Sequence, residues 1–176
     1  MADRSGELKE ELLCSCKEFS HDCSATIKES CLGQHPSIAV LCCSDSRVPP
    51  ELIFKKTVGE LFVVRVAGNV AVDTSVIFSL EYAVEHLGVD MLLVLGHSGC
   101  GAVAASEVCN CAENEILAEI QNSFELHDDH CVSNLMRQVE LLPQRSKIIS
   151  EALEKGDLVL TGALYHIEDG GLEYLF

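Results

Sequence analysis

Residues 37–47 read Ser-Ile-Ala-Val-Leu-Cys-Cys-Ser-Asp-Ser-Arg, and residues 91–101 read Met-Leu-Leu-Val-Leu-Gly-His-Ser-Gly-Cys-Gly. In each stretch a short apolar run is followed at once by small and polar residues, which is typical of a buried strand that ends in a turn. Strands that are buried on both faces read as continuous apolar runs in parallel sheets. The two stretches therefore predict the central strands of an α/β fold.

Extended and helical patterns alternate on either side of these two stretches. Further strands are expected over 61–66 and 158–165, with a short edge strand after Gly171. Helices are expected over 7–19, 73–87, from 101 onward, and over 113–127, 132–142 and 145–155, with Pro143 breaking the helix before it. Strands separated by helices indicate a mainly parallel β-sheet flanked by helices. We expect a single domain over 1–176, with a helical arm over 1–35 and an α/β core over 36–176.

Composition narrows the class of protein. The 176 residues are 48% apolar, which is enough for one domain with a sizeable core. No apolar run approaches the ~20 residues that span a bilayer, and the first ten residues lack the apolar segment of a signal peptide. We therefore expect a cytoplasmic protein whose ten cysteines are reduced thiols and not a disulfide scaffold. A net charge of −16 argues against nucleic acid as a partner.

Three residues of the types that bind metals follow the two apolar stretches: Cys43, His97 and Cys100. The carboxyl ends of parallel strands meet at one edge of a sheet, where ligand sites of such folds lie. Two thiolates and one imidazole make a Cys2His zinc set with an open fourth position, which distinguishes a catalytic zinc from a closed structural one. The sequence predicts one zinc ion per chain.

Three other interpretations compete for the same residues. A cysteine nucleophile with His97 as its base would leave Cys43 without a role. Gly96 and Gly101 have the spacing of a phosphate loop, but the Lys-Ser/Thr pair that such a loop requires is absent. A non-enzymatic zinc domain, with Asp45 as a closing fourth ligand, stays open as an alternative.

Asp45 and Arg47 lie in the turn directly after Cys43. An arginine fork can hold a carboxylate through two parallel hydrogen bonds. A carboxylate held in that way beside an open metal site can accept a hydrogen bond from the metal's water and turn the lone pair of that water toward a substrate. This pair is therefore the candidate catalytic pair.

Taken together, the two motifs closely resemble those of the β-class carbonic anhydrases, and most of all their plant-type, open-site branch. The resemblance spans about residues 34 to 172. The matching segments are 43–54, 59–65, 67–69, 81–84, 96–102, 134, 137–139 and 162–163. The chain has no tryptophan, so it cannot contain the tryptophan of the family's bicarbonate-inhibited branch.

The resemblance implies reversible hydration of carbon dioxide to bicarbonate and a proton. Carried over by position, it implies zinc on Cys43, His97 and Cys100, with Asp45 and Arg47 as the catalytic pair. Hydrolysis of carbonyl sulfide or carbon disulfide on the same zinc site is the enzymatic alternative.

The resemblance also implies that Gln34, Phe62 and Tyr82 contact the substrate, and that the active unit is a homodimer, alone or paired into a dimer of dimers. In the plant-type branch the glutamine acts from the partner subunit. Gln34 precedes the first strand, whereas Cys43 follows it, and a strand of ~7 residues spans roughly 20 Å. We therefore expect Gln34 to complete the site of the partner chain.

Overall fold

The computed structural model describes residues 4–109 and 113–175. The chain divides into two compact units, Met1–Gln34 and His35–Phe176. The described part of the first unit consists of α1 (Arg4–Asp22) and α2 (Ser24–Ser30), neither of which has a buried residue. Its apolar side chains face outward, with Leu12 70% and Leu32 92% exposed. Helix formation in this unit therefore does not rest on a core of its own.

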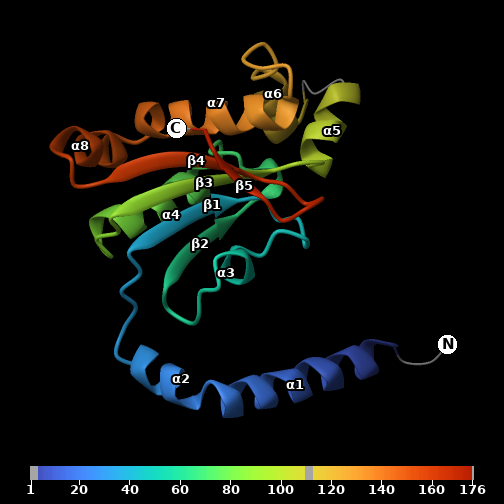
Figure 1. Cartoon of the computed structure of the whole chain (residues 1–176), viewed down its shortest axis with the longest axis vertical. Coiled ribbons are helices and arrows are strands. Elements are labelled where there is room, and N and C mark those ends of the chain that lie inside the picture. The colour runs from blue at the N-terminus through green and yellow to red at the C-terminus, as the bar shows by residue number, and fades with distance from the viewer. Residues whose placement is uncertain (1–3, 110–112, 176) are drawn as a thin grey trace. The chain divides into compact units, whose positions relative to one another are not determined.

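The second unit is built on a five-stranded sheet in the order β2-β1-β3-β4-β5 (Figure 1). The strands are β1 (Ile38–Cys42), β2 (Leu61–Arg65), β3 (Met91–His97), β4 (Val159–Tyr165) and β5 (Leu172–Tyr174). The first four strands run parallel, and β5 pairs antiparallel with β4. The predicted mainly parallel α/β sheet is confirmed.

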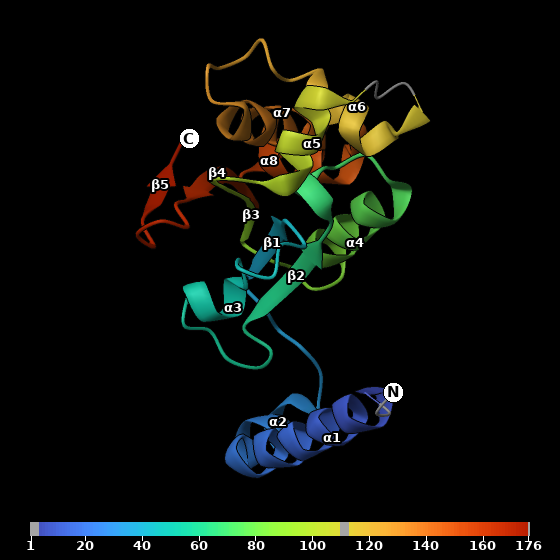
Figure 2. The same cartoon turned by 90° about the vertical axis from the view of Figure 1, so that its right-hand side faces the viewer.

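Helices cover both faces of this sheet (Figures 1 and 2). The helical segments of this unit are α3 (Pro50–Ile53), the 3-10 turn η1 (Ala67–Asn69), α4 (Thr74–Glu85), α5 (Gly101–Val108), α6 (Glu115–Gln121), α7 (His130–Arg145) and α8 (Lys147–Lys155). On β1, Ala39 and Leu41 join the core formed with α4, α7 and α8. Val40 and Cys42 alternate with them and pack on the opposite face, where α3 lies. This alternation explains the continuous apolar run, because both faces of the strand are buried.

The strand order places the chemistry-bearing motifs side by side. β1 pairs with β2 on one side and with β3 on the other. The chain thus passes from β1 to β2 on one side and then crosses to β3 on the other side, which creates a switch point at the carboxyl ends of β1 and β3. In the register, Cys42 lies opposite Leu95, so the turns that follow both strands begin next to each other.

The structure differs from the sequence-based expectations in three elements. Pro143 lies inside α7, which runs on to Arg145. A proline disturbs the turn that precedes it, and here it falls in the last turn, where Ser146 N still donates to Leu142 O. The helix expected over 113–127 is only seven residues long as α6. The short α3, which begins at Pro50, was not among the predicted helices.

Eight of the described cysteines are free, and Cys109 is disulfide-bonded, which departs from the expected reduced state at that position. Within residues 4–109 and 113–175, no helix has the length and apolar character needed to cross a membrane.

Candidate metal centre

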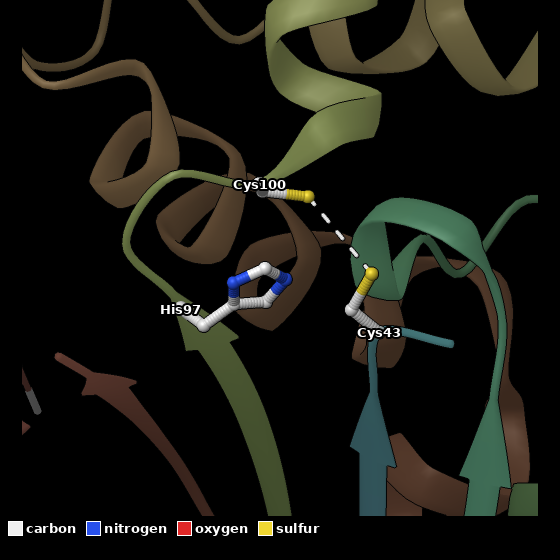
Figure 3. A group of neighbouring side chains, drawn as sticks. All are labelled: Cys43, His97 and Cys100. Carbon is white, nitrogen blue, oxygen red and sulfur yellow. Dashed lines mark hydrogen bonds between the residues drawn. The ribbon is translucent and has the colours of Figure 1, made fainter. Parts of the chain in front are cut away.

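Cys43, His97 and Cys100 converge at the switch point (Figure 3). Cys43 directly follows β1, His97 is the last residue of β3, and Cys100 is the N-cap of α5. Their ligand atoms lie within 4.8 Å of one another, and all three side chains are buried. The local sequence explains the convergence, because Gly99 has a φ of +61° and turns the chain back between His97 and Cys100.

The geometry of the three side chains fits a metal ion. The two sulfur atoms are 3.9 Å apart, close to the ~3.8 Å expected for two thiolates bound tetrahedrally to one zinc at about 2.3 Å. Nε2 of His97 is buried and has no hydrogen-bond partner among the described residues. Its Nδ1 faces Ser98 O at 2.9 Å, which assigns the proton to Nδ1 and leaves the Nε2 lone pair free for a metal. The group can therefore hold a metal ion.

The electrostatics of the metal-free site favour one thiolate. The hydrogen bond with Cys100 is the largest effect that lowers the pKa of Cys43, to about 4, helped by His97 and by the backbone N–H of Gly68. The same Cys43 contact, together with burial, raises the pKa of Cys100. Burial opposes ionisation of His97, but the Cys43 sulfur raises its pKa overall. A metal must therefore displace a proton chiefly from Cys100.

Asp45 and Arg47 form a two-pronged ion pair beside this group. Arg47 Nε donates to Asp45 Oδ1 at 2.9 Å, and Nη2 donates to Oδ2 at 2.7 Å. The backbone N–H of Arg47 also donates to Oδ1. These hydrogen bonds hold the pKa of Asp45 well below its usual range. Asp45 Oδ2 is 3.9 Å from Nε2 of His97, so the carboxylate lies at the edge of the metal group.

Two groups that support the site were not singled out from the sequence. Arg65, at the end of β2, donates to Cys43 O at 3.1 Å and to Asp45 O at 2.6 Å. Its signal was a single arginine within an otherwise apolar strand. The backbone N–H of Gly68 donates to Cys43 Sγ at 3.3 Å. Such a contact cannot be predicted from residue type, because its donor is a main-chain N–H.

Two of the three residues expected at the substrate, Phe62 and Tyr82, do not lie around the metal group of the same chain. Phe62 pairs with Ala39, four positions before Cys43 and hence roughly 13 Å back along the strand. The ring of Tyr82, on α4, lies 6.2 Å from that of Phe62. Gln34 is exposed and belongs to the N-terminal unit. Phe62 and Tyr82 therefore lie together near the amino ends of the strands.

The sequence and the fold were compared with those of known proteins. Residues 38–172 match the family described as carbonic anhydrase. The chain is 35% identical over 153 residues to carbonic anhydrase 2 of Mycobacterium tuberculosis H37Rv, covering 78% of this chain and 73% of that protein. It superposes on the Coccomyxa β-carbonic anhydrase in complex with acetazolamide with a TM-score of 0.82 and 26% identity, covering 99% and 87% of the two chains. It also shares the fold of a tetrameric β-carbonic anhydrase from Sordaria macrospora, with a TM-score of 0.81, 23% identity and coverage of 97% and 95%.

Proposed function

The chain belongs to the β-carbonic anhydrase family, and on that premise we propose that it catalyses the reversible hydration of carbon dioxide to bicarbonate and a proton. The observation that carries the proposal is the placement of three metal-type ligands beside a carboxylate that is already held by an arginine. A closed structural site would need a fourth ligand. Both oxygens of Asp45 are instead engaged by Arg47, which favours an open fourth position.

We propose that Cys43, His97 and Cys100 hold one zinc ion. Bound there, zinc would act as a Lewis acid that lowers the pKa of water toward ~7 and so supplies a nucleophile at neutral pH. The buried surroundings of the two sulfurs, which include Val70 and Val103, keep the site in a low-dielectric setting. In such a setting the electrostatic effects of the ligands are stronger than in water.

Asp45 acts as the orienting group. Its low pKa keeps it ionised across the working range of pH, so it can only accept hydrogen bonds. Arg47 fixes both oxygens of the carboxylate. The carboxylate would then accept a hydrogen bond from the nucleophilic water, which directs a lone pair of that water toward the carbon of the substrate. Arg47 also donates to Gly99 O at 3.2 Å, which ties the pair to the turn between His97 and Cys100.

We propose that the active unit is a homodimer in which Gln34, Phe62 and Tyr82 serve the site of the partner chain. Phe62 and Tyr82 lie near the amino ends of the strands, whereas the ligands lie at the carboxyl ends. A two-fold dimer makes such a contribution reciprocal.

Stopped-flow measurement of CO2 hydration on protein of known zinc content tests the function. We expect a rate proportional to bound zinc, and a loss of most turnover in Asp45→Asn with zinc retained. Zinc-loaded wild type that does not hydrate CO2 would contradict the proposal. Parallel assays with carbonyl sulfide and carbon disulfide separate the enzymatic alternative, because sulfide release would then exceed hydration.

Mixing two impaired chains tests the dimer. Cys43→Ser chains lack the metal site, whereas Gln34→Ala chains keep it but lack the glutamine. In a mixed dimer the intact metal site receives a normal Gln34 from its partner, so activity per zinc should rise above that of the Gln34→Ala homodimer. No rise, once subunit exchange has been verified by mass spectrometry, would show that Gln34 does not act across the interface.

A further inference from the structure

A chain of buried hydrogen bonds leads from α7 to the sulfur of Cys43. Asn134 Nδ2 donates to Gly68 O at 2.7 Å, and the N–H of Gly68 donates to Cys43 Sγ at 3.3 Å. Gln138 lies one turn further along the helix, where its Nε2 donates to Asn134 Oδ1 at 3.1 Å and its Oε1 accepts from Ala71 N at 2.8 Å. Two side chains of one helix thus hold both ends of the turn that contacts the metal ligand.

The burial of these two amides points to a dedicated role. Asn134 is 1% and Gln138 0% exposed, and burying an amide costs free energy unless its polar atoms are paired. The hydrogen bonds described above connect the side chains of Asn134 and Gln138 to the turn and to each other. An apolar helix face could pack on the sheet without them, as Leu135 does against Gly96. The presence of two buried amides is therefore explained by their hydrogen bonds to the turn and not by the packing of α7 on the sheet.

Gly68 in this turn is also closely packed by neighbouring helices. Gly68 has a φ of +70°, and a Cβ at this position would lie 2.6 Å from Ile120 Cδ1 and 3.3 Å from Ala102 Cβ. Ile120 of α6 and Ala102 of α5 thus pack closely against Gly68, while Asn134 binds its carbonyl. This packing and the bond to its carbonyl hold the Gly68 peptide with its N–H directed toward the sulfur of Cys43.

We propose that Asn134 and Gln138 are positioning residues that fix the Gly68 amide on Cys43 Sγ and thereby set how much charge this sulfur donates to the metal. The inference rests on the metal site of the proposed function. A hydrogen bond to a ligand atom withdraws electron density from it, and outer partners of this kind tune the metal as well as orienting its ligands. Without the hydrogen bonds of Asn134 and Gln138 to the turn, the sulfur of Cys43 would be more electron-rich and less well placed for the metal.

The test uses cobalt(II) substituted for zinc in the full-length protein. The sulfur-to-cobalt charge-transfer band in the near ultraviolet reports the electron density on the thiolates. In Asn134→Ala we expect this band to move to longer wavelength and metal affinity, measured by competition with a chelator, to fall about tenfold. Gln138→Met, which has similar length but no amide, should give a smaller shift in the same direction, and it serves if Asn134→Ala does not fold.

Ser133→Ala is the matched control. Ser133 neighbours Asn134, is fully buried, and also donates from α7 to a backbone carbonyl, that of His127 at 2.8 Å. It does not touch the Gly68 turn through that bond, so its band and its metal affinity should equal those of wild type even where thermal stability falls.

The outcomes separate this inference from the function on which it rests. An Asn134→Ala protein that loses stability like Ser133→Ala but keeps the wild-type band and affinity would overturn the positioning role. Wild type without a thiolate band would refute the metal site itself. Wild type with the band but without CO2 hydration would refute the proposed function, while the band shift would still decide the role of Asn134.

Discussion

Replacing Arg47 by alanine would remove the fork that orients Asp45 while leaving the three metal ligands in place. Three side-chain hydrogen bonds disappear: two to the Asp45 oxygens, at 2.9 and 2.7 Å, and one to Gly99 O at 3.2 Å. The backbone N–H of residue 47 keeps its bond to Asp45 Oδ1 at 2.9 Å. The carboxylate can then rotate about this one bond. Its Oδ2 is already 3.9 Å from His97 Nε2, so a small rotation would bring it within reach of a metal held by the three ligands, where it could act as a fourth ligand.

The size of the effect follows from the exposure of the pair. A hydrogen bond to a charged group contributes about 1.5–3 kcal/mol when it is shielded from water, and an exposed ion pair about 0.2–1 kcal/mol. The Arg47 side chain is 53% exposed and that of Asp45 16%, so the pair lies between these cases. We expect the productive orientation to lose about 1.5 kcal/mol. Since about 1.4 kcal/mol corresponds to a factor of ten, kcat/KM should fall about tenfold.

Stopped-flow CO2 hydration near pH 8, with zinc measured in the same samples, provides the assay. Arg47→Lys is the matched control, because lysine keeps the positive charge but cannot form the planar fork. We expect unchanged zinc in both variants, with the lysine variant between wild type and alanine. Equal turnover per zinc in wild type and Arg47→Ala would refute the orienting role of Arg47. Loss of zinc in proportion to activity would show that the residue acts on metal binding instead.

The remaining predictions concern the ligands, the turn and the pH dependence. Cys43→Ser should lose both zinc and activity, and full zinc occupancy in metal analysis would contradict the ligand assignment. Gly68→Ala should destabilise the protein in denaturant unfolding by about 1–3 kcal/mol from overpacking and about 1 kcal/mol from its positive φ, with part of this recovered by Ile120→Val, which removes the atom that a Cβ would meet at 2.6 Å. Because Arg47 lowers the pKa of Asp45, the wild-type carboxylate stays ionised as pH falls, whereas in Arg47→Ala its pKa should return toward ~3.9. On acidification, Arg47→Ala should therefore lose activity at a higher pH than wild type. Identical pH–activity profiles of the two proteins on the acid side would contradict this effect of Arg47 on Asp45.

Local pattern was sufficient for most of the strands and helices and for the grouping of Cys43, His97 and Cys100. The apolar runs before Cys43 and His97 predicted β1 and β3, because strands buried on both faces need continuous apolar sequence. Side chains with few alternative roles, two cysteines and a histidine after strand ends, then indicated a metal site. The sequence was less successful where local signals compete. Pro143 reads as a helix breaker, but near the end of α7 its missing N–H affects only the turn before it.

Other features depended on which segments meet in space. The sequence alone determined that Cys43, Asp45 and Arg47 share one turn, since they are adjacent in the chain. Only the tertiary structure decided that the N–H of Gly68 faces the sulfur of Cys43 and that Asn134 fixes that turn, 66 residues away in the chain. The physical reason is that residue type and periodicity report local propensity and burial, whereas a main-chain donor looks the same at every position. The acceptor of such a main-chain donor is determined only by how the strands and helices pack.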